Sequence, residues 1–119
     1  MDDFWDDPIE VPPQGTIESE LLRLSALLET RTNDIAVNAQ RNAVADVAYK
    51  RTHAIALLEV DGRNAEEREA RAHQQVLAEY EAKRISEALL VSAQEAARNI
   101  RAQLSSLQTL AANQRALVS

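Results

Sequence analysis

The chain contains no cysteine among its 119 residues, which excludes disulfide bonds and thiolate metal sites. Its longest apolar run covers residues 54–58, whereas a helix that crosses a bilayer needs about 20 apolar residues. The amino-terminal region is acidic and lacks the basic segment with which a signal peptide begins. From these absences we expect a soluble, cytoplasmic protein with no membrane partner.

Glycine and proline, which disfavour the interior of a helix, are nearly absent beyond residue 15. Gly62 is the single exception in residues 16–119, and it lies in the polar segment Asp61-Gly62-Arg63-Asn64. The sequence therefore predicts an all-α fold in which residues 16–119 form a long antiparallel helical hairpin with its turn at residues 61–64. We expect this coiled-coil-like hairpin to assemble into a helical-bundle oligomer.

Capping residues mark where the two helices should begin. Thr16 is expected to cap the first helix, and Asn64, with Glu67 three residues later, is expected to cap the second. Weak helix formers cluster at residues 30–34 without forbidding helix. A break of the first helix at that cluster stays open as an alternative.

Apolar residues recur at helical spacing on both sides of the turn. In the second helix their mean spacing is close to 3.6, which predicts little supercoiling. This stripe consists of Ala82, Ile85, Leu89, Ala93, Ala96, Ile100, Leu104, Leu107 and Ala111. Folding about the turn places residue i near residue 125 minus i, so Val37, Val44 and Val47 are expected to face the second helix.

Aromatic residues are scarce, and much of the 45% hydrophobic fraction is alanine, which buries little surface. A hairpin with such a thin core gains stability by assembling. Near its tip, Ile55, Leu57 and Leu58 find no apolar partner on the second helix. We predict that these three residues bind a second copy or another protein.

The net charge of −6 is concentrated in residues 1–15, which carry five carboxylates and no basic residue. Prolines and this charge predict a disordered acidic tail. The tail also holds two of the four aromatic residues, and its predicted partner-binding residues are Asp2, Asp3, Phe4, Trp5, Asp6 and Asp7. These side chains suit an apolar groove rimmed by Lys or Arg; the alternative is a tail that only solubilises the chain.

The carboxyl-terminal end is the basic counterpart of the tail. Beyond Glu95 no acidic side chain occurs, while Arg98, Arg101 and Arg115 remain. Arginines on one helix can contact phosphates, but three of them provide only a weak electrostatic footprint. Direct nucleic-acid binding at these C-terminal arginines is the weaker of the two partner predictions.

No residue pattern indicates catalysis. His53 and His73 lack the repeated Glu-x-x-His spacing of helical metal sites, and the charges of residues 66–71 fit a solvated helix face. A nucleophile elbow and a phosphate-binding glycine loop are both missing from the sequence. We therefore expect a protein that is not an enzyme and that uses no cofactor or metal.

Several segments of the chain resemble small helical proteins of tailed phages and prophages. They are Tyr49-Lys50 through Ala54, Leu57-Leu58-Glu59, Gly62, Ala65-Glu66-Glu67-Arg68-Glu69-Ala70 and the Leu-rich residues 107–115. The resemblance covers residues 45–119 and excludes the acidic tail, so it assigns no functional residue there. Proteins of this kind tend to be encoded among replication and recombination genes, and their activity is poorly defined.

The resemblance implies a phage protein of the host-cell cytoplasm. On that basis we expect a non-enzymatic binding protein that is an accessory in phage DNA metabolism through protein contacts and, at the C-terminal arginines, DNA contacts. One alternative is an inhibitor of a host protein whose acidic-aromatic tail mimics phosphates or a peptide. Another is a virion or assembly component whose helices pack into a larger particle.

Overall fold

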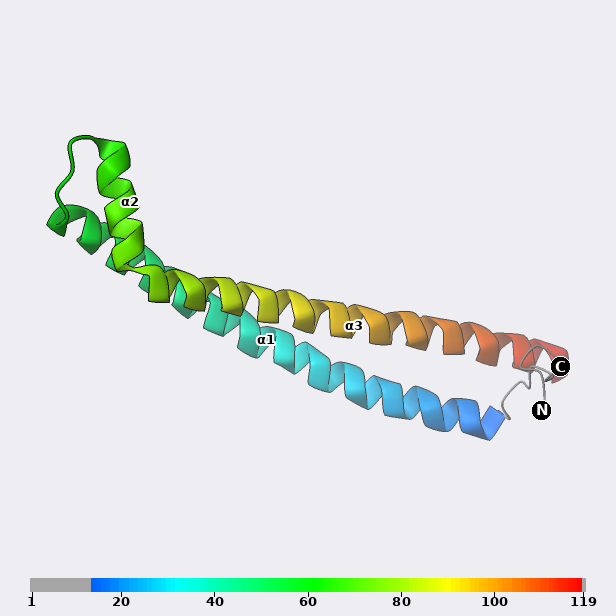
Figure 1. The fold of residues 1–119 in the computed structure, drawn as a ribbon. Coiled ribbons are helices and arrows are strands. Elements are labelled where there is room, and N and C mark those ends of the chain that lie inside the picture. The colour runs from blue at the N-terminus through cyan, green and yellow to red at the C-terminus, as the bar shows by residue number, and fades with distance from the viewer. Residues whose placement is uncertain (1–13, 119) are drawn as a thin grey trace, which may run out of the picture.

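The computed structural model describes residues 14–118. Within this range it contains the helices α1 (Gln14–Glu59), α2 (Ala65–Gln75) and α3 (Leu77–Val118). α1 and α3 run antiparallel, and α2 turns across the carboxyl end of α1 (Figure 1). The principal extents are 78 × 35 × 20 Å and the radius of gyration is 24.7 Å, against about 13.5 Å for a compact globule of this length. The predicted all-α helical hairpin is confirmed, and it is a rod.

α1 is one continuous helix of 46 residues. The weak helix formers in its middle are accommodated by hydrogen bonds to carbonyls one turn back: Thr30 Oγ1 donates to Ala26 O at 3.4 Å and Thr32 Oγ1 to Leu28 O at 2.8 Å. The helix therefore does not break at residues 30–34. It also begins at Gln14, so Thr16 lies inside the first turn and is not the cap that the sequence predicted.

The turn between α1 and α2 is held by side chains at the start of α2. The Asn64 side-chain oxygen accepts from the Glu67 N–H at 2.8 Å, as predicted, and the Arg63 N–H donates to Glu67 Oε2 at 3.4 Å. Arg71 Nη1 donates to the Asp61 carbonyl at 2.6 Å. The first bond satisfies one of the α2 N–H groups that have no intrahelical partner, and the other two tie the loop residues Arg63 and Asp61 to α2.

The second half of the hairpin bends at Val76, a feature that the sequence did not predict. Val76 is the carboxyl cap of α2, and its N–H donates to both the Ala72 and the His73 carbonyls at 3.2 Å. The bend turns α2 onto α1 and buries Ala72 and Val76 against Ala56 in a small core. We call this junction of α1, α2 and α3 the elbow.

The contact line between α1 and α3, here called the seam, follows a strict heptad. The least exposed positions recur at alternating spacings of four and three, the pattern of a coiled coil. In α1 they are Ile17, Leu21, Leu24, Leu28, Arg31, Ile35, Asn38, Asn42, Ala45, Tyr49, Thr52 and Ala56. In α3 they are Glu79, Lys83, Ser86, Leu90, Ala93, Ala97, Ile100, Leu104, Leu107, Ala111 and Gln114.

This heptad corrects the stripe expected with a spacing of 3.6. Ile85 and Leu89 lie outside the seam, with 61% and 50% of their surface exposed. The pairing of the helices is displaced as well: Asn42 bonds to Ser86 rather than lying opposite Lys83, as the 125-minus-i rule required. The displacement is close to one helical turn, because α2 adds residues that do not advance along α1.

Candidate binding surface

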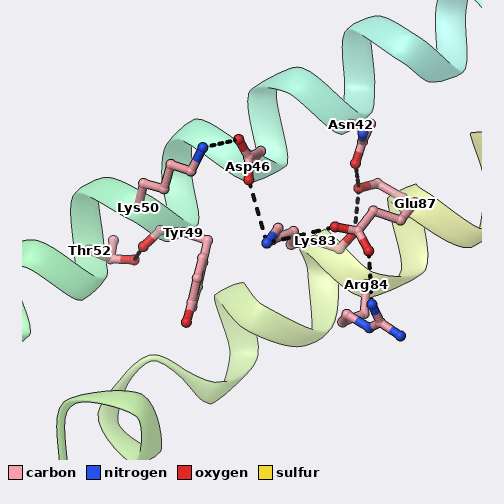
Figure 2. Close-up of polar contacts among 9 residues, drawn as sticks. Asn42, Asp46, Tyr49, Lys50, Thr52, Lys83, Arg84 and Glu87 are labelled. Atoms are coloured by element: carbon pink, nitrogen blue, oxygen red, sulfur yellow. Dashed lines mark hydrogen bonds and ion pairs between the residues drawn. The ribbon is translucent and has the colours of Figure 1, made fainter. Parts of the chain in front are cut away.

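The half of the hairpin next to the elbow has one polar edge, formed around Asp46 of α1 (Figure 2). Asp46 pairs with Lys50 at 2.8 Å and with Lys83 of α3 at 3.6 Å, and Lys83 reaches Glu87 at 3.7 Å. The hydrogen bond from Lys50, assisted by the charge of Lys83, holds the pKa of the Asp46 carboxyl below its usual value. The same bond raises the pKa of the Lys50 ammonium group. Charged side chains on this edge therefore pair with one another across α1 and α3.

The seam beside this edge is itself polar. The Ser86 hydroxyl shares its proton between two acceptors: it donates to Asn42 Oδ1 across the seam at 3.0 Å and to the Lys83 carbonyl at 2.7 Å. A polar pair at seam positions specifies register at a cost in apolar burial. The middle of the rod is therefore aligned by hydrogen bonds rather than by large apolar side chains.

An aromatic cluster links the three helices at the elbow. Tyr49 stacks on His53, with 5.5 Å between ring centroids, and contacts Tyr80 at 5.6 Å; His73 meets Tyr80 edge-on at 4.7 Å. His53 Nε2 also pairs with Glu69 Oε1 of α2 at 3.0 Å. In residues 14–118 no three His, Asp or Glu side chains converge as a metal site would require. Both histidines have packing partners that account for their positions.

The opposite edge of the same half is apolar and open. At 3.6 residues per turn, Val44 projects from α1 away from Asp46, and Leu89 projects from α3 away from Glu87. Asp46 of α1 and Glu87 of α3 lie on the same side of the rod, because both pair with Lys83. The opposite surfaces of the two helices, which carry Val44 and Leu89, therefore also lie together, on the other side of the rod. We call this surface the open face; its large apolar members are Val37, Val44, Val47, Ile55, Leu58, Ile85 and Leu89, all of them exposed.

Two adjoining hollows run along the α1 part of the open face. The first, of about 410 Å³, is lined by Gln40, Ala43, Val44, Val47, Ala48 and Arg51. The second, of about 400 Å³, is lined by Val37, Gln40, Arg41, Val44 and Ala45. Together they form what we call the α1 groove, an apolar strip with an arginine toward each end. Neither arginine has an ion-pair partner among the described residues.

The predicted apolar patch near the tip is only partly separate from the elbow core. Ile55 is exposed and Leu58 is 88% exposed. Leu57, in contrast, packs against the core of Ala56, Ala72 and Val76. Ile55 and Leu58 thus extend the open face, whereas Leu57 is a packing residue. The six predicted tail residues, from Asp2 to Asp7, lie outside the part of the chain that the structure describes.

The C-terminal arginines all lie on the exposed surface of α3. Arg98 pairs with Glu95 at 3.3 Å. Arg101 and Arg115 are fourteen residues apart in sequence, which places them on one side of the helix about 21 Å from each other. Arg101 and Arg115 thus form a sparse basic strip, and nucleic-acid binding there stays a prediction.

Val44 and Ile85 are surface residues that the sequence reasoning assigned to the core. A signal for the true position of Val44 exists in α1. The spacing of Ile17, Leu21, Leu24 and Leu28 sets a heptad phase, and extending it reaches Asn42, Ala45 and Tyr49 and passes by Val44. Hydrophobicity alone instead predicted that the valines of α1 face the second helix. The seam residues at this level are polar or small, so hydrophobicity misidentified the inner face.

Comparison with known proteins adds no relative. No known protein family matches the chain, and neither a curated protein nor a solved structure does. The phage resemblance therefore stays a prediction. Within residues 14–118, no helix combines the length and the apolar character needed to cross a membrane.

Proposed function

We propose that the protein is a non-catalytic binding protein that associates with a second copy, and with partner proteins, through the open face. One observation carries the proposal: large apolar side chains lie on the outside of the elbow half while its seam is polar. Val44 and Ile85 are 64% and 61% exposed, whereas Ser86 is buried in the seam. A contiguous exposed apolar surface is typical of protein interaction sites.

The rod shape supports a contact role over an enzymatic one. The hollows on the described surface, such as those of the α1 groove, are open to solvent, whereas substrate sites usually enclose most of their ligand. Association through the open face would place a second hairpin beside the first and produce the helical bundle expected from the sequence.

The phage resemblance extends this proposal to a biological setting. An accessory protein of phage DNA metabolism would use the open face for self-association or for a replication or recombination protein. Arg101 and Arg115 would then add a weak contact to phosphates, because their charges are exposed and lie on one side of α3.

Light scattering after size exclusion tests the association. The 13.2 kDa chain is expected to give a mass above the monomer that rises with concentration. The double variant Ile85→Ser, Leu89→Ser should return it to a monomer without loss of helical circular dichroism, since both side chains are outside the seam.

A matched control replaces two exposed leucines at the other end of the rod from the open face, Leu22→Ser and Leu117→Ser, which are 74% and 86% exposed. These changes remove comparable apolar surface and should leave the mass unchanged. A wild-type protein that is monomeric at every concentration would refute self-association, and equal effects of the two double variants would refute the open face as its site.

A further inference from the structure

We propose that the α1 groove of one copy binds the acidic-aromatic segment, residues 2–7, of a second copy. This inference rests on the proposed function and names the occupant of one part of the open face. The segment reads Asp-Asp-Phe-Trp-Asp-Asp and contains no basic residue. It supplies two large apolar rings between two pairs of carboxylates.

The α1 groove has the complementary chemistry. Its apolar lining includes Val37, Val44 and Val47, and Arg41 and Arg51 are also among its lining residues. Elsewhere on α1, Arg23 pairs with Glu20, and Arg31 pairs with Asp34 at 3.3 Å. Arg41 and Arg51 have no such carboxylate in the described part of the chain, so their charges are available to an acidic ligand.

The spacing of charges matches along the groove. Arg41 and Arg51 are ten residues apart on α1, which corresponds to about 15 Å. In an extended peptide the centres of the two aspartate pairs are four residues apart, or about 13 Å. A peptide lying along α1 would therefore place one carboxylate pair near each arginine and its two rings over the valines between them.

The reach of the chain decides between the molecule's own segment and that of another copy. Val44 is thirty residues from Gln14 along α1, a distance of about 45 Å. Trp5 is nine residues before Gln14, so even a fully extended chain carries it only about 32 Å. The ring cannot reach the centre of its own groove. The contact is therefore intermolecular.

Trp5 is the only tryptophan in the chain, which makes its fluorescence a specific probe of this contact. An indole that leaves water emits at shorter wavelength. For the full-length protein we expect the Trp5 emission to shift to shorter wavelength as concentration rises, over the range in which light scattering reports association. High salt should weaken the shift, because the arginine–carboxylate attractions are screened.

Charge reversal tests the assigned residues. Arg41→Glu with Arg51→Glu should move the midpoint of the Trp5 shift to about tenfold higher concentration, the effect of converting two exposed attractions into repulsions. Adding Asp3→Lys and Asp6→Lys to that variant should restore the midpoint. The control reverses two other exposed arginines, Arg101→Glu with Arg115→Glu, and should change nothing.

The outcomes separate this inference from the proposed function. If the protein associates while the Trp5 emission stays constant, or if the Arg41 and Arg51 reversal leaves the shift intact, the groove does not bind the segment and self-association stands. If light scattering shows a monomer at every concentration, both the groove contact and self-association through the open face are wrong. Rescue by Asp3→Lys and Asp6→Lys would support the pairing directly, and a failed rescue would overturn the assignment of these charges.

Discussion

Replacing Leu24 or Leu22 by alanine distinguishes the inner face of α1 from its outer face. The two leucines are two residues apart, yet Leu24 is 2% exposed in the seam and Leu22 is 74% exposed. A buried Leu→Ala change costs about 2–5 kcal/mol, depending on how well the site closes or fills. Leu24 borders a solvent-open hollow with Ala102 and Leu107, so water can enter the vacated space. We therefore expect about 2–3 kcal/mol for Leu24→Ala, at the low end of that range.

Leu22→Ala should change the free energy of unfolding by less than about 0.5 kcal/mol, as for other surface substitutions. Urea unfolding followed by far-ultraviolet circular dichroism measures both values. The measurement is made at the lowest practical concentration, because association adds stability of its own. Equal losses for the two variants, or a larger loss for Leu22→Ala, would refute the heptad assignment of α1.

Three further predictions follow from local contacts. Gly62→Ala should destabilise the folded protein by about 1–2 kcal/mol, because an added Cβ would lie 2.9 Å from the Arg68 backbone nitrogen. In Gly15→Ala the added Cβ meets nothing within 4 Å, so this change should stabilise α1 by about 0.5–1 kcal/mol. Urea unfolding of the two variants and the wild type measures both effects. Because the pKa of Asp46 is lowered in the folded protein, its ion pairs stabilise the fold at pH values above the unfolded pKa of about 3.9. This stabilisation is lost as the pH falls through the pKa of the folded state. The difference in urea midpoint between the wild type and Asp46→Asn should therefore shrink below about pH 4. Replacing the C-terminal arginines together with alanine should abolish any salt-sensitive DNA mobility shift; no shift by the wild type at low salt would refute direct DNA binding.

The sequence was sufficient to predict the helical hairpin and its turn. The near absence of glycine and proline after residue 15 predicted the helices, and the Asn64 cap predicted where the turn ends. Both signals depend only on residues close together in the sequence. The bend at Val76 was not predictable in this way, since it carries neither residue type. Its cause is tertiary: Ala72 and Val76 become buried only because α2 turns onto Ala56.

The binding surface was harder to predict than the fold. Ile55 and Leu58 were identified as unpartnered apolar residues, and both are exposed. Val44 and Ile85 were missed because the most apolar residues of the elbow half do not occupy its inner face. Extending the heptad phase from Ile17 would have placed Val44 correctly, but that phase passes through Asn38 and Asn42, which apolar patterning rejects.

The polar seam and the open face have a common physical basis. A seam of Asn42, Ser86 and Lys83 fixes how α1 and α3 align, because a displaced register would leave these groups without their partners. It also leaves the elbow half with little apolar burial between its helices. The valines and isoleucines on the outside can supply that burial only by contacting another surface. Association would therefore add apolar burial to this half of the hairpin, so binding and folding of the elbow half should be thermodynamically linked.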